Sequence, residues 1–406
     1  MTFAPSPTLR KVLSGQLCSG CGLCAGVSPD AVRMETVAPG YSRPRQVASL
    51  SPDQEQKVAA SCPGSVVAPW GGAPNLHPYW GPWRQILTGH AQDAELRFAG
   101  SSGAALSALL IHALRSGRVD RVLHVAADSQ QPTRNTLAWS VTPDEVMQNA
   151  GSRYASSSPL ADIEAVLAQD VRVAFVGKPC DVSALRQLAT VDSRVNLRFP
   201  LMLSFFCGGI PSHDGADRIV RAMGLEPENV VRFRYRGNGW PGKARAETAN
   251  GRVAEMSYAE SWGGHLSKEV QFRCKICPDA VGGVADIACA DAWYGSDDGY
   301  PSFEEEEGRS LIVSRTEAGD DLLADALSAG MVSVSPLDVD EIELMQPAQA
   351  RRKRLVASRN ASCRVLMQPL PDMRGLDVMT AARRAGIGEQ LRNFIGAMRR
   401  IVTNRR

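Results

Sequence analysis

Three cysteines in the stretch CSGCGLC, residues 18–24, limit what the start of this chain can fold around. Their C-x2-C-x2-C spacing is that of a bacterial ferredoxin motif, in which three thiolates bind one cubane [4Fe–4S] cluster. The full motif continues with a Cys-Pro pair after three more residues, and Ser28-Pro29 takes that place here. The fourth ligand must therefore lie elsewhere, and the lost cysteine raises the question of whether a second cluster exists.

The stretch AASCPGS supplies a candidate fourth ligand, because Cys62 precedes Pro63. In the ferredoxin pattern each cluster takes three cysteines from one motif and a distant Cys-Pro cysteine from the other. We therefore predict that one [4Fe–4S] cluster is bound by Cys18, Cys21, Cys24 and Cys62. The alternative is a zinc site, but structural zinc sites favour paired C-x2-C units over three cysteines in this register.

Four further cysteines are candidates for a second cluster. Cys180 in VGKPCD and Cys207 in SFFCGG each follow an apolar run typical of a strand, and RCKICPDA contributes Cys274 and Cys277. Loops at the ends of such strands share one edge of an α/β sheet, so the four thiols could converge. Buried cysteines also serve as simple apolar residues, and residue type alone leaves both interpretations open. Cys289 is a weaker substitute, since its strand-like context is typical of a buried thiol.

The composition is that of an ordinary globular protein, with 44% apolar and 22% charged residues among 406. No apolar run approaches the roughly 20 residues that span a bilayer. The first residues lack the apolar segment of an export signal. Ten cysteines in such a chain favour metal binding over disulfides, so we predict a cytoplasmic protein. Nothing in the chain indicates a nucleic-acid partner.

The alternation of expected helices and strands predicts an α/β (α+β) fold in three parts. Residues 1–85 form a ferredoxin-like [4Fe–4S] domain with its linker, 86–345 a mixed-sheet flavin-binding core, and 346–406 a basic helical tail. Expected helices cover 100–117, 162–170, 181–189 and 217–224, and expected strands 119–127, 171–177, 201–209 and 230–237. The aromatic residues of the turn-rich stretch 68–83 favour packing of a linker over ligand binding.

Two glycine- and serine-rich turns are candidates for binding an anionic cofactor. RFAGSSGAALS, residues 97–107, opens a helix whose backbone N–H groups suit a phosphate, although it is not a G-x-G-x-x-G fingerprint. NAGSRYASSS, residues 149–158, adds Arg153 for a phosphate and Tyr154 for stacking. Close helix packing and a solvated arginine are the simpler alternatives.

The tail carries most of the positive charge. From Arg351 onward 14 Arg or Lys residues face three acids, whereas the whole chain has a net charge of only +2. Within 376–402 an apolar helix face is expected, made by Ile387, Leu391, Phe394, Ile395, Met398 and Ile401. We expect this helix to dock on its own protein. An acidic partner or, less favoured, an anionic membrane surface is the alternative.

Taken together, the motifs resemble the beta subunit family of coenzyme F-420 hydrogenases and dehydrogenases, which includes 7-hydroxymethyl chlorophyll a reductase. The resemblance rests on ordered agreement of many short segments rather than on any one of them. They are CSGCGLC, CPG, AGSSGAALSALL, GSRYASS, VAFVGKPCDVSALR, LSFFCGGIPS, FRYRGNGWPGK, FRCKICPDAVGGVADIACADAW and GRSLIVSRTEAG.

The resemblance implies an iron–sulfur flavoprotein that holds two [4Fe–4S] clusters and FAD. It makes Cys180, Cys207, Cys274 and Cys277 the ligands of the second cluster. It places the flavin near Gly100, Ser101, Ser102, Gly103, Ser152, Arg153 and Tyr154. Two departures fall beside the proposed ligands, since the family's usual G-T-P-C-Q is here GKPCD and its C-H-G is here CGG. The substrate therefore cannot be carried over from the family.

We accordingly predict an oxidoreductase that relays electrons from a soluble donor such as ferredoxin, or from a partner redox subunit. The electrons would pass through both clusters to FAD and on to an organic small-molecule acceptor. One alternative is an electron-transfer subunit whose partner carries the substrate chemistry. Another is a degenerate member that serves as a metal-stabilised binding module. No catalytic residue is identified by the sequence.

Overall fold

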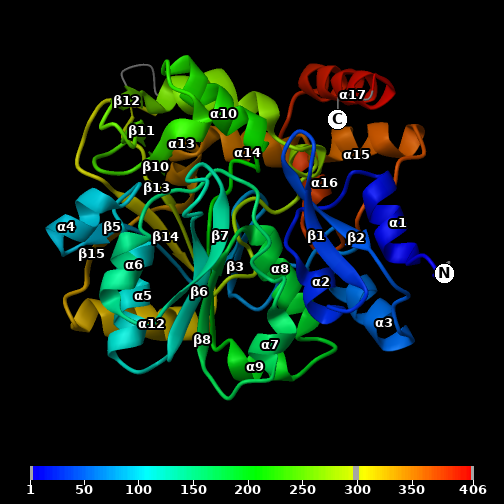
Figure 1. The fold of residues 1–406 in the computed structure, drawn as a ribbon, viewed down its shortest axis with the longest axis horizontal. Coiled ribbons are helices and arrows are strands. Elements are labelled where there is room, and N and C mark those ends of the chain that lie inside the picture. Colours follow the sequence, from blue (N-terminus) through cyan, green and yellow to red (C-terminus); the bar gives the residue numbers. More distant parts are fainter. Residues whose placement is uncertain (1–2, 296–300, 404–406) are drawn as a thin grey trace.

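An eight-stranded mixed sheet forms the centre of the protein in a computed structural model that describes residues 3–295 and 301–403 (Figure 1). From one edge to the other its strands are β15 (Val332–Pro336), β5 (Gln85–Ala91), β14 (Ser310–Ser314), β13 (Ile287–Asp291), β9 (Leu201–Phe205), β8 (Val173–Gly177), β6 (Arg121–Ala127) and β7 (Asn135–Ser140). Strands β13, β9, β8 and β6 pair in parallel, and the remaining pairs are antiparallel. The predicted α/β class with a mixed sheet is confirmed.

Each face of the sheet packs into its own hydrophobic core, because side chains alternate along a strand. In β8, Val173 and Phe175 enter one core and Ala174 enters the other. The first core contains α8 (Pro179–Leu188) and α7 (Ile163–Leu167), and the second contains α5 (Ala105–Arg115) and α12 (Glu317–Ser328). The predicted strands and helices of this region are present, with ends that differ by a few residues.

Residues 3–65 pack on the core that contains α7 and α8. Their elements are α1 (Pro7–Ser14), α2 (Leu23–Val27), the hairpin of β1 (Val32–Val37) and β2 (Tyr41–Gln46), and α3 (Pro52–Ser61). Leu9, Val12, Leu23 and Val58 share one hydrophobic cluster with Leu185 of α8. The segment therefore has apolar support from the main body, and a specifically ferredoxin-like fold is not confirmed.

The aromatic stretch 68–83 packs against the body, as its packing interpretation predicted. It contains the short strands β3 (Asn75–His77) and β4 (Gly81–Trp83). Trp70, Tyr79 and Trp80 are buried, and the Trp80 ring stacks on Phe206 with centroids 6.1 Å apart.

A three-stranded sheet and several short helices complete the body. The sheet consists of β10 (Val230–Arg234), β11 (Ala244–Thr248) and β12 (Val253–Met256). The short helices are α4 (Ala94–Ala99), α6 (Pro143–Gln148), α9 (Arg194–Arg198), α10 (His213–Ala222), η1 (Pro227–Asn229), η2 (Ala259–His265), η3 (Leu266–Glu269), α11 (Phe272–Lys275), η4 (Val339–Glu341) and α13 (Ile342–Met345). No helix within the described residues is long and apolar enough to cross a membrane.

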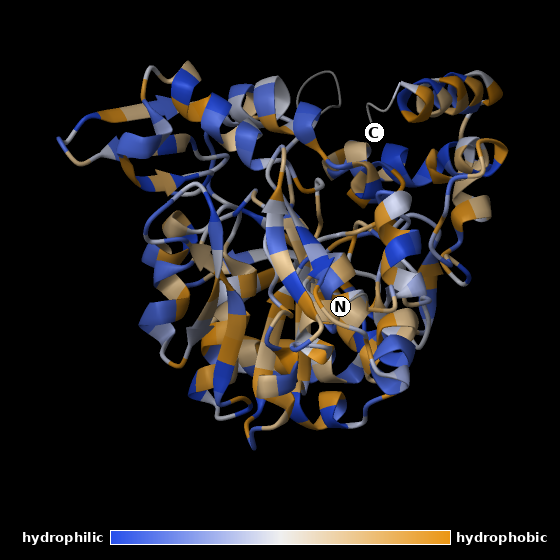
Figure 2. Cartoon of the chain, turned by 45° about the vertical axis from the view of Figure 1, so that its right-hand side comes forward, coloured by the Kyte–Doolittle hydropathy of each residue, from blue (hydrophilic) through white to orange (hydrophobic). Residues whose placement is uncertain are grey.

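The tail forms α14 (Pro347–Arg354), α15 (Val356–Val365), α16 (Val378–Ala382) and α17 (Ile387–Val402). Helix α17 packs beside α15 at the periphery, where Ser362 Oγ donates a 2.8 Å hydrogen bond to Phe394 O (Figure 2). Of the six apolar residues expected to face the protein, only Ile401 is buried. The helix does dock on its own protein, because Ile401 belongs to the core that contains α7 and α8, and Gln390 Nε2 donates a 3.0 Å hydrogen bond to Arg354 O of α14. Ile387, Leu391 and Ile395 of the expected apolar face nevertheless stay exposed.

Candidate functional site

The first cysteine group (Cys18, Cys21, Cys24 and Cys62) is buried between α1, α2 and α3. Gly20 and Gly22 lie between its cysteines with φ of 81° and 86°, a conformation that favours glycine and lets the loop curl around its thiols. Gly20 N donates a 3.4 Å hydrogen bond to Cys18 Sγ. The motif glycines and a backbone donor thus shape a loop that points sulfur atoms inward.

Electrostatics shows that these four thiols are close neighbours. Burial raises the pKa of every thiol in the group, to about 11 for Cys62. The negative charge of Cys62 further raises the pKa of Cys21 and of Cys24. Buried thiolates this close together destabilise one another, and a bound cationic iron core would relieve that repulsion. The residues therefore fit a metal cluster.

The second cysteine group (Cys180, Cys207, Cys274 and Cys277) gathers at the carboxyl ends of β8 and β9. These two strands are parallel neighbours, so Cys180 and Cys207, which follow them, share one sheet edge. Ile210 N donates a 3.4 Å hydrogen bond to Cys274 Sγ, and Gly209 N donates one of 3.4 Å to Cys207 Sγ. Such N–H to sulfur contacts are typical of iron–sulfur sites.

The thiols of the second group raise one another's pKa, as those of the first group do. Burial and then the charge of Cys274 raise the pKa of Cys207 to about 12. The pKa of Cys180 is raised by burial first, and the charges of Cys207 and Cys274 add to it. Cys289 lies outside the group in β13, where burial alone raises its pKa to about 12. The separate loops thus meet as the sheet topology predicts.

Neither group has the geometry of a single-ion site. Within the described residues, no set of three or more His, Cys, Asp or Glu side chains is placed to hold one metal ion. Four thiolates around a zinc ion must lie about 2.3 Å from a common centre.

Helices α14 and α15 hold the loops of the second group, a role that sequence reasoning missed. Arg352 Nη1 donates a 2.8 Å hydrogen bond to Cys207 O, and Arg359 Nη1 donates one of 2.7 Å to Lys275 O. Lys353 Nζ donates a 2.5 Å hydrogen bond to Pro278 O. These three basic residues, which the sequence assigned to a charged tail, therefore hydrogen-bond to the backbone around Cys207 and the C-x2-C loop.

A large cleft adjoins the second group and has a volume of about 1480 Å³ when the solvent at its mouth is included. Cys207 lines it, as do most of the predicted flavin residues, Gly100, Ser101, Ser102, Ser152, Arg153 and Tyr154. The sequence-predicted flavin neighbourhood and the second cysteine group therefore share one cavity.

The helix that opens onto this cleft can accept an anion at its amino end. Helix α5 begins at Ala105, has no side-chain cap, and contributes Leu106 and Ser107 to the lining of the cleft. The N–H of Ala105 donates a 3.4 Å hydrogen bond to Ser310 Oγ, and the next N–H groups of this first turn suit a phosphate. Gly103 does not line the cleft, since an added Cβ there would lie 2.5 Å from Gly89 O and 2.7 Å from Ser310 N. The missing side chain of Gly103 thus lets its backbone pack closely against Gly89 and Ser310.

Arg153 lines the cleft, but its guanidinium is already occupied. Nε donates a 2.9 Å hydrogen bond to Asn135 Oδ1, and the terminal nitrogens donate to the carbonyls of Pro132, Arg134 and Phe233. A bidentate phosphate contact would require these bonds to be given up. Arg153, which was expected to bind a phosphate, thus links its own backbone segment to residues 132–134 and to Phe233 along the wall of the cleft.

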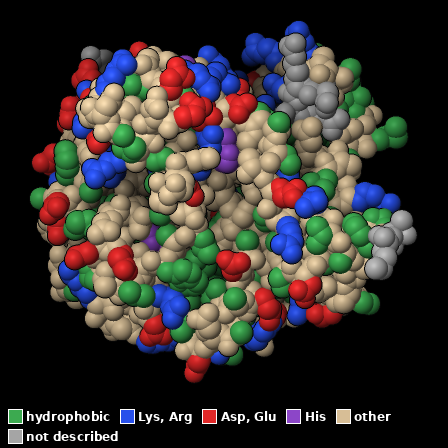
Figure 3. Space-filling model, viewed as in Figure 1, with side chains coloured by type: hydrophobic (Ala, Val, Ile, Leu, Met, Phe, Trp, Pro, Cys, Tyr) green, Lys and Arg blue, Asp and Glu red, His purple; other side chains and the backbone are tan. Residues whose placement is uncertain are grey.

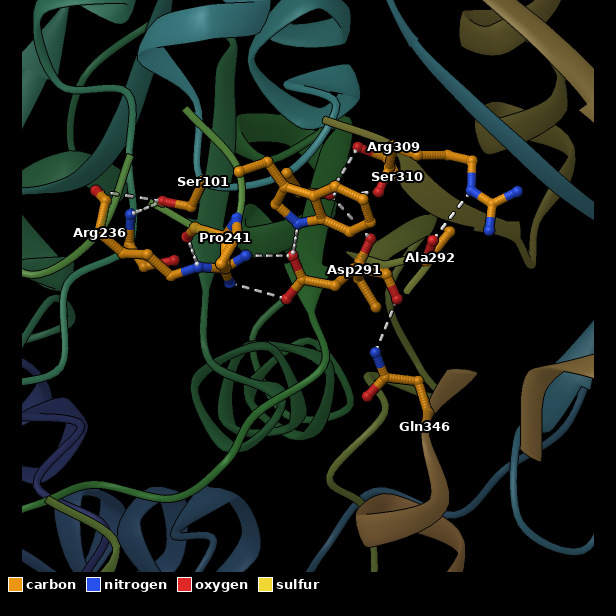
Figure 4. Close-up of polar contacts among 12 residues, drawn as sticks. Ser101, Arg236, Pro241, Asp291, Ala292, Arg309, Ser310 and Gln346 are labelled. Carbon is orange, nitrogen blue, oxygen red and sulfur yellow. Dashed lines mark hydrogen bonds and ion pairs between the residues drawn. The ribbon is translucent and has the colours of Figure 1, made fainter. Parts of the chain in front are cut away.

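A buried ion pair at the cleft was not anticipated from the sequence (Figure 4). The Arg236 guanidinium donates two hydrogen bonds of 2.8 and 2.7 Å to the Asp291 carboxylate, and Trp240 Nε1 donates one of 2.8 Å. Arg236 Nε donates to Pro241 O at 2.5 Å, and Ser101 Oγ donates to Arg236 O at 3.4 Å. Arg236 and Asp291 both line the cleft. The sequence motifs that contain them gave no indication that they pair.

A second buried ion pair joins Lys178 and Asp181. Lys178 Nζ lies 2.7 Å from Asp181 Oδ2, and both residues line the cleft. Burial alone would lower the pKa of Lys178, but the charges of Asp181, Cys180 and Cys21 raise it. The pKa of Lys178 thus responds to a thiol from each cysteine group. Both paired residues stand where the sequence departs from the family pattern.

The fold and site define an α/β protein with two four-cysteine groups, the second of which borders a cleft through Cys207. Two family models of the coenzyme F420 hydrogenase/dehydrogenase beta subunit match the chain, the one for its C terminus over residues 170–340 and the one for its N-term over 86–163. The chain belongs to this family, as its motifs predicted. The first cysteine group lies outside both matched ranges, and the second lies within 170–340.

Named relatives extend this assignment. Coenzyme F420 hydrogenase subunit beta of Methanococcus voltae is 25% identical over 72% of this chain and 99% of its own length. The chloroplastic 7-hydroxymethyl chlorophyll a reductase of Oryza sativa subsp. japonica is 24% identical over 64% of this chain and 52% of its own. The family places the chain among electron-transfer oxidoreductases.

One solved structure shares the fold. A chain of the F420-reducing [NiFe] hydrogenase complex from Methanosarcina barkeri superposes with a TM-score of 0.56 at 20% identity, covering 74% of this chain and 99% of that one. At this identity the likeness concerns the fold alone.

Proposed function

We propose that the protein is an iron–sulfur flavoprotein oxidoreductase that relays electrons between a redox partner and an organic acceptor. The first and second cysteine groups would each hold a [4Fe–4S] cluster, and the cleft would hold FAD. One observation carries the proposal: Cys207 belongs to the second group and also lines the cleft beside Ser101 and Ser152. A cluster ligand in the wall of the flavin cavity is the arrangement that electron exchange between the two needs.

Each set of residues has a role in this proposal. The uncapped amino end of α5 would bind the flavin phosphates, and Ser101 and Ser152 would orient them. The backbone donors at Gly20, Gly209 and Ile210 would stabilise the reduced form of each cluster by hydrogen bonds to sulfur. When bound, the clusters supply one-electron and the flavin two-electron chemistry.

The donor and acceptor are proposed by class. A ferredoxin-type protein or a partner redox subunit would deliver electrons, since several relatives are named as subunits of hydrogenases and dehydrogenases. A deazaflavin such as coenzyme F420 is the first acceptor to test, because those relatives are named for it. The alternative, an electron-transfer subunit without its own acceptor, is compatible with the same cysteine groups.

Metal and flavin analysis of anaerobically purified protein tests the proposal. We expect about eight iron and eight sulfide per chain, in two cubane clusters, together with FAD. Clusters without flavin, even after reconstitution with FAD, would favour the electron-transfer subunit. Protein that takes up neither iron nor flavin would contradict the proposal and favour a binding module.

A further inference from the structure

Helix α17 presents an apolar stripe to solvent rather than to its own protein. Ile387, Leu391, Ile395 and Val402 are 88%, 56%, 56% and 71% exposed and fall on one side of the helix. Arg392 and Arg399 flank this stripe, are exposed, and have no carboxylate partner among residues 3–295 and 301–403. Isolated exposed apolar residues are ordinary, but a continuous stripe beside unpaired charge is typical of an interaction surface.

The charge around the stripe is positive. Burial, and then the charges of Arg352, Arg400 and Arg351, lower the pKa of Arg359 to about 10. The carboxylate of Glu389 pairs with Arg351 at 2.8 Å and offsets only part of this potential. Figure 3 shows Lys and Arg side chains gathered in the upper right, where α17 lies. Such a field attracts an anionic partner.

This surface continues to the second cysteine group. Arg359 on α15 donates its 2.7 Å hydrogen bond to the carbonyl of Lys275, which lies between Cys274 and Cys277. Arg359 Nη2 donates a second hydrogen bond, of 3.2 Å, to Asn393 Oδ1 on α17. A protein seated on α17 would therefore lie next to the C-x2-C loop. An anionic membrane would fit the stripe and the arginines, but the adjacency to this loop favours a redox partner.

We propose that the outer face of α17, with Arg392 and Arg399, is the docking surface for a small acidic iron–sulfur electron carrier. This inference rests on the proposed function. In the docked complex one electron leaves the reduced cluster of the carrier, which is oxidised, and enters the cluster of the second cysteine group, which is reduced. No bond or proton is exchanged. Opposite charges would speed the encounter, and the apolar stripe would hold a transient interface.

Stopped-flow reduction of the whole protein tests the surface. A purified, chemically reduced bacterial [4Fe–4S] ferredoxin is mixed with the oxidised protein, and cluster bleaching is followed at several salt concentrations. The double variant R392E/R399E is compared with R232E/R252E, which makes the same charge change on exposed arginines of the β10–β12 sheet, at the opposite side of Figure 1. Dithionite, a small reductant that needs no docking surface, serves as the second donor.

We expect R392E/R399E to lower the rate constant with ferredoxin about tenfold at low salt and to flatten its salt dependence. The control pair should change it less than twofold, and dithionite should reduce all three proteins alike. I387S/L391S should slow the reaction without changing its salt dependence.

Equal rates for R392E/R399E and R232E/R252E would overturn the docking surface, as would a wild-type protein that dithionite reduces and ferredoxin does not. Loss of binding to anionic phospholipid vesicles in R392E/R399E, with unchanged ferredoxin kinetics, would overturn it in favour of a membrane. A protein without reducible clusters would instead overturn the proposed function.

Discussion

The two cysteine groups each bring four thiols together, but from different parts of the fold. The first is built almost entirely from one local motif and Cys62, and its thiols are buried against the core that contains α7 and α8. The second takes its cysteines from three loops, is partly exposed, and borders the cleft through Cys207. Only the second lies within the matched family ranges. In the proposed function, the second group would therefore serve the cleft directly, and the first would reach it through the second.

Loss of Cys207 should have the largest effect, because this residue belongs to both the second group and the cleft. We expect Cys207→Ala to lose about four iron and to abolish reduction of bound flavin by the electron donor. Iron analysis and anaerobic flavin absorbance measure both. Cys289→Ala, a buried cysteine that also lines the cleft, is the control and should keep its iron. Full iron content in Cys207→Ala would remove this residue from the ligand set.

Loss of Cys62 should distinguish the role of the first cysteine group from that of the second. Cys62→Ala should also lose about four iron, yet the second cluster and chemical reduction of the flavin should survive. Because residues 3–65 share a core with α8, we expect a lower melting temperature rather than an unfolded segment. Cys363→Ala, another buried cysteine, is the control. If flavin reduction by dithionite disappears with Cys62, the proposed order of the groups is wrong.

The hydrogen bonds from α14 should support the second cysteine group and not the first. Arg352→Met removes the donors to Cys207 O and Gly208 O, and we expect it to cost about 1.5–3 kcal/mol of the free energy of unfolding. It should also make the second cluster easier to lose to a chelator, while the first is retained. Urea unfolding and timed iron release provide the measurements. Arg364→Met, on the exposed side of α15, should match the wild type, and equal behaviour of the two variants would refute this support.

The smallest expected effect concerns the loop of the first group. Gly20→Ala places a side chain at φ 81°, with its Cβ 3.2 Å from Ser42 O, and should cost about 1–2 kcal/mol of the free energy of unfolding. Gly71→Ala, at an ordinary φ and in open space, should be near neutral. Chemical denaturation distinguishes them. A neutral Gly20→Ala would mean that the motif does not need this backbone turn.

Sequence reasoning anticipated the family and the mixed sheet, and six of the seven residues it proposed for the flavin, all except Gly103, line the cleft. It also placed the strand ends that carry Cys180 and Cys207 on a shared edge, because parallel strands align their carboxyl ends. It gave no indication of the pairing between Arg236 and Asp291, which lie 55 residues apart in the chain. An arginine and an aspartate in separate segments carry no signal of their contact until those segments are placed.

Local chemistry explains what could be known before folding. The spacing of Cys18, Cys21 and Cys24, with glycines between them, sets how one loop can present its thiols, so it predicts their grouping without knowledge of any other segment. Long-range contacts explain the remainder. Arg153 was expected to bind phosphate, yet its donors bind carbonyls from 132–134 and from Phe233. Arg352 likewise stands 145 residues from the Cys207 carbonyl that it holds. Such partners are chosen by how sheet and helices pack, because a buried donor must take whichever acceptor the fold brings within reach.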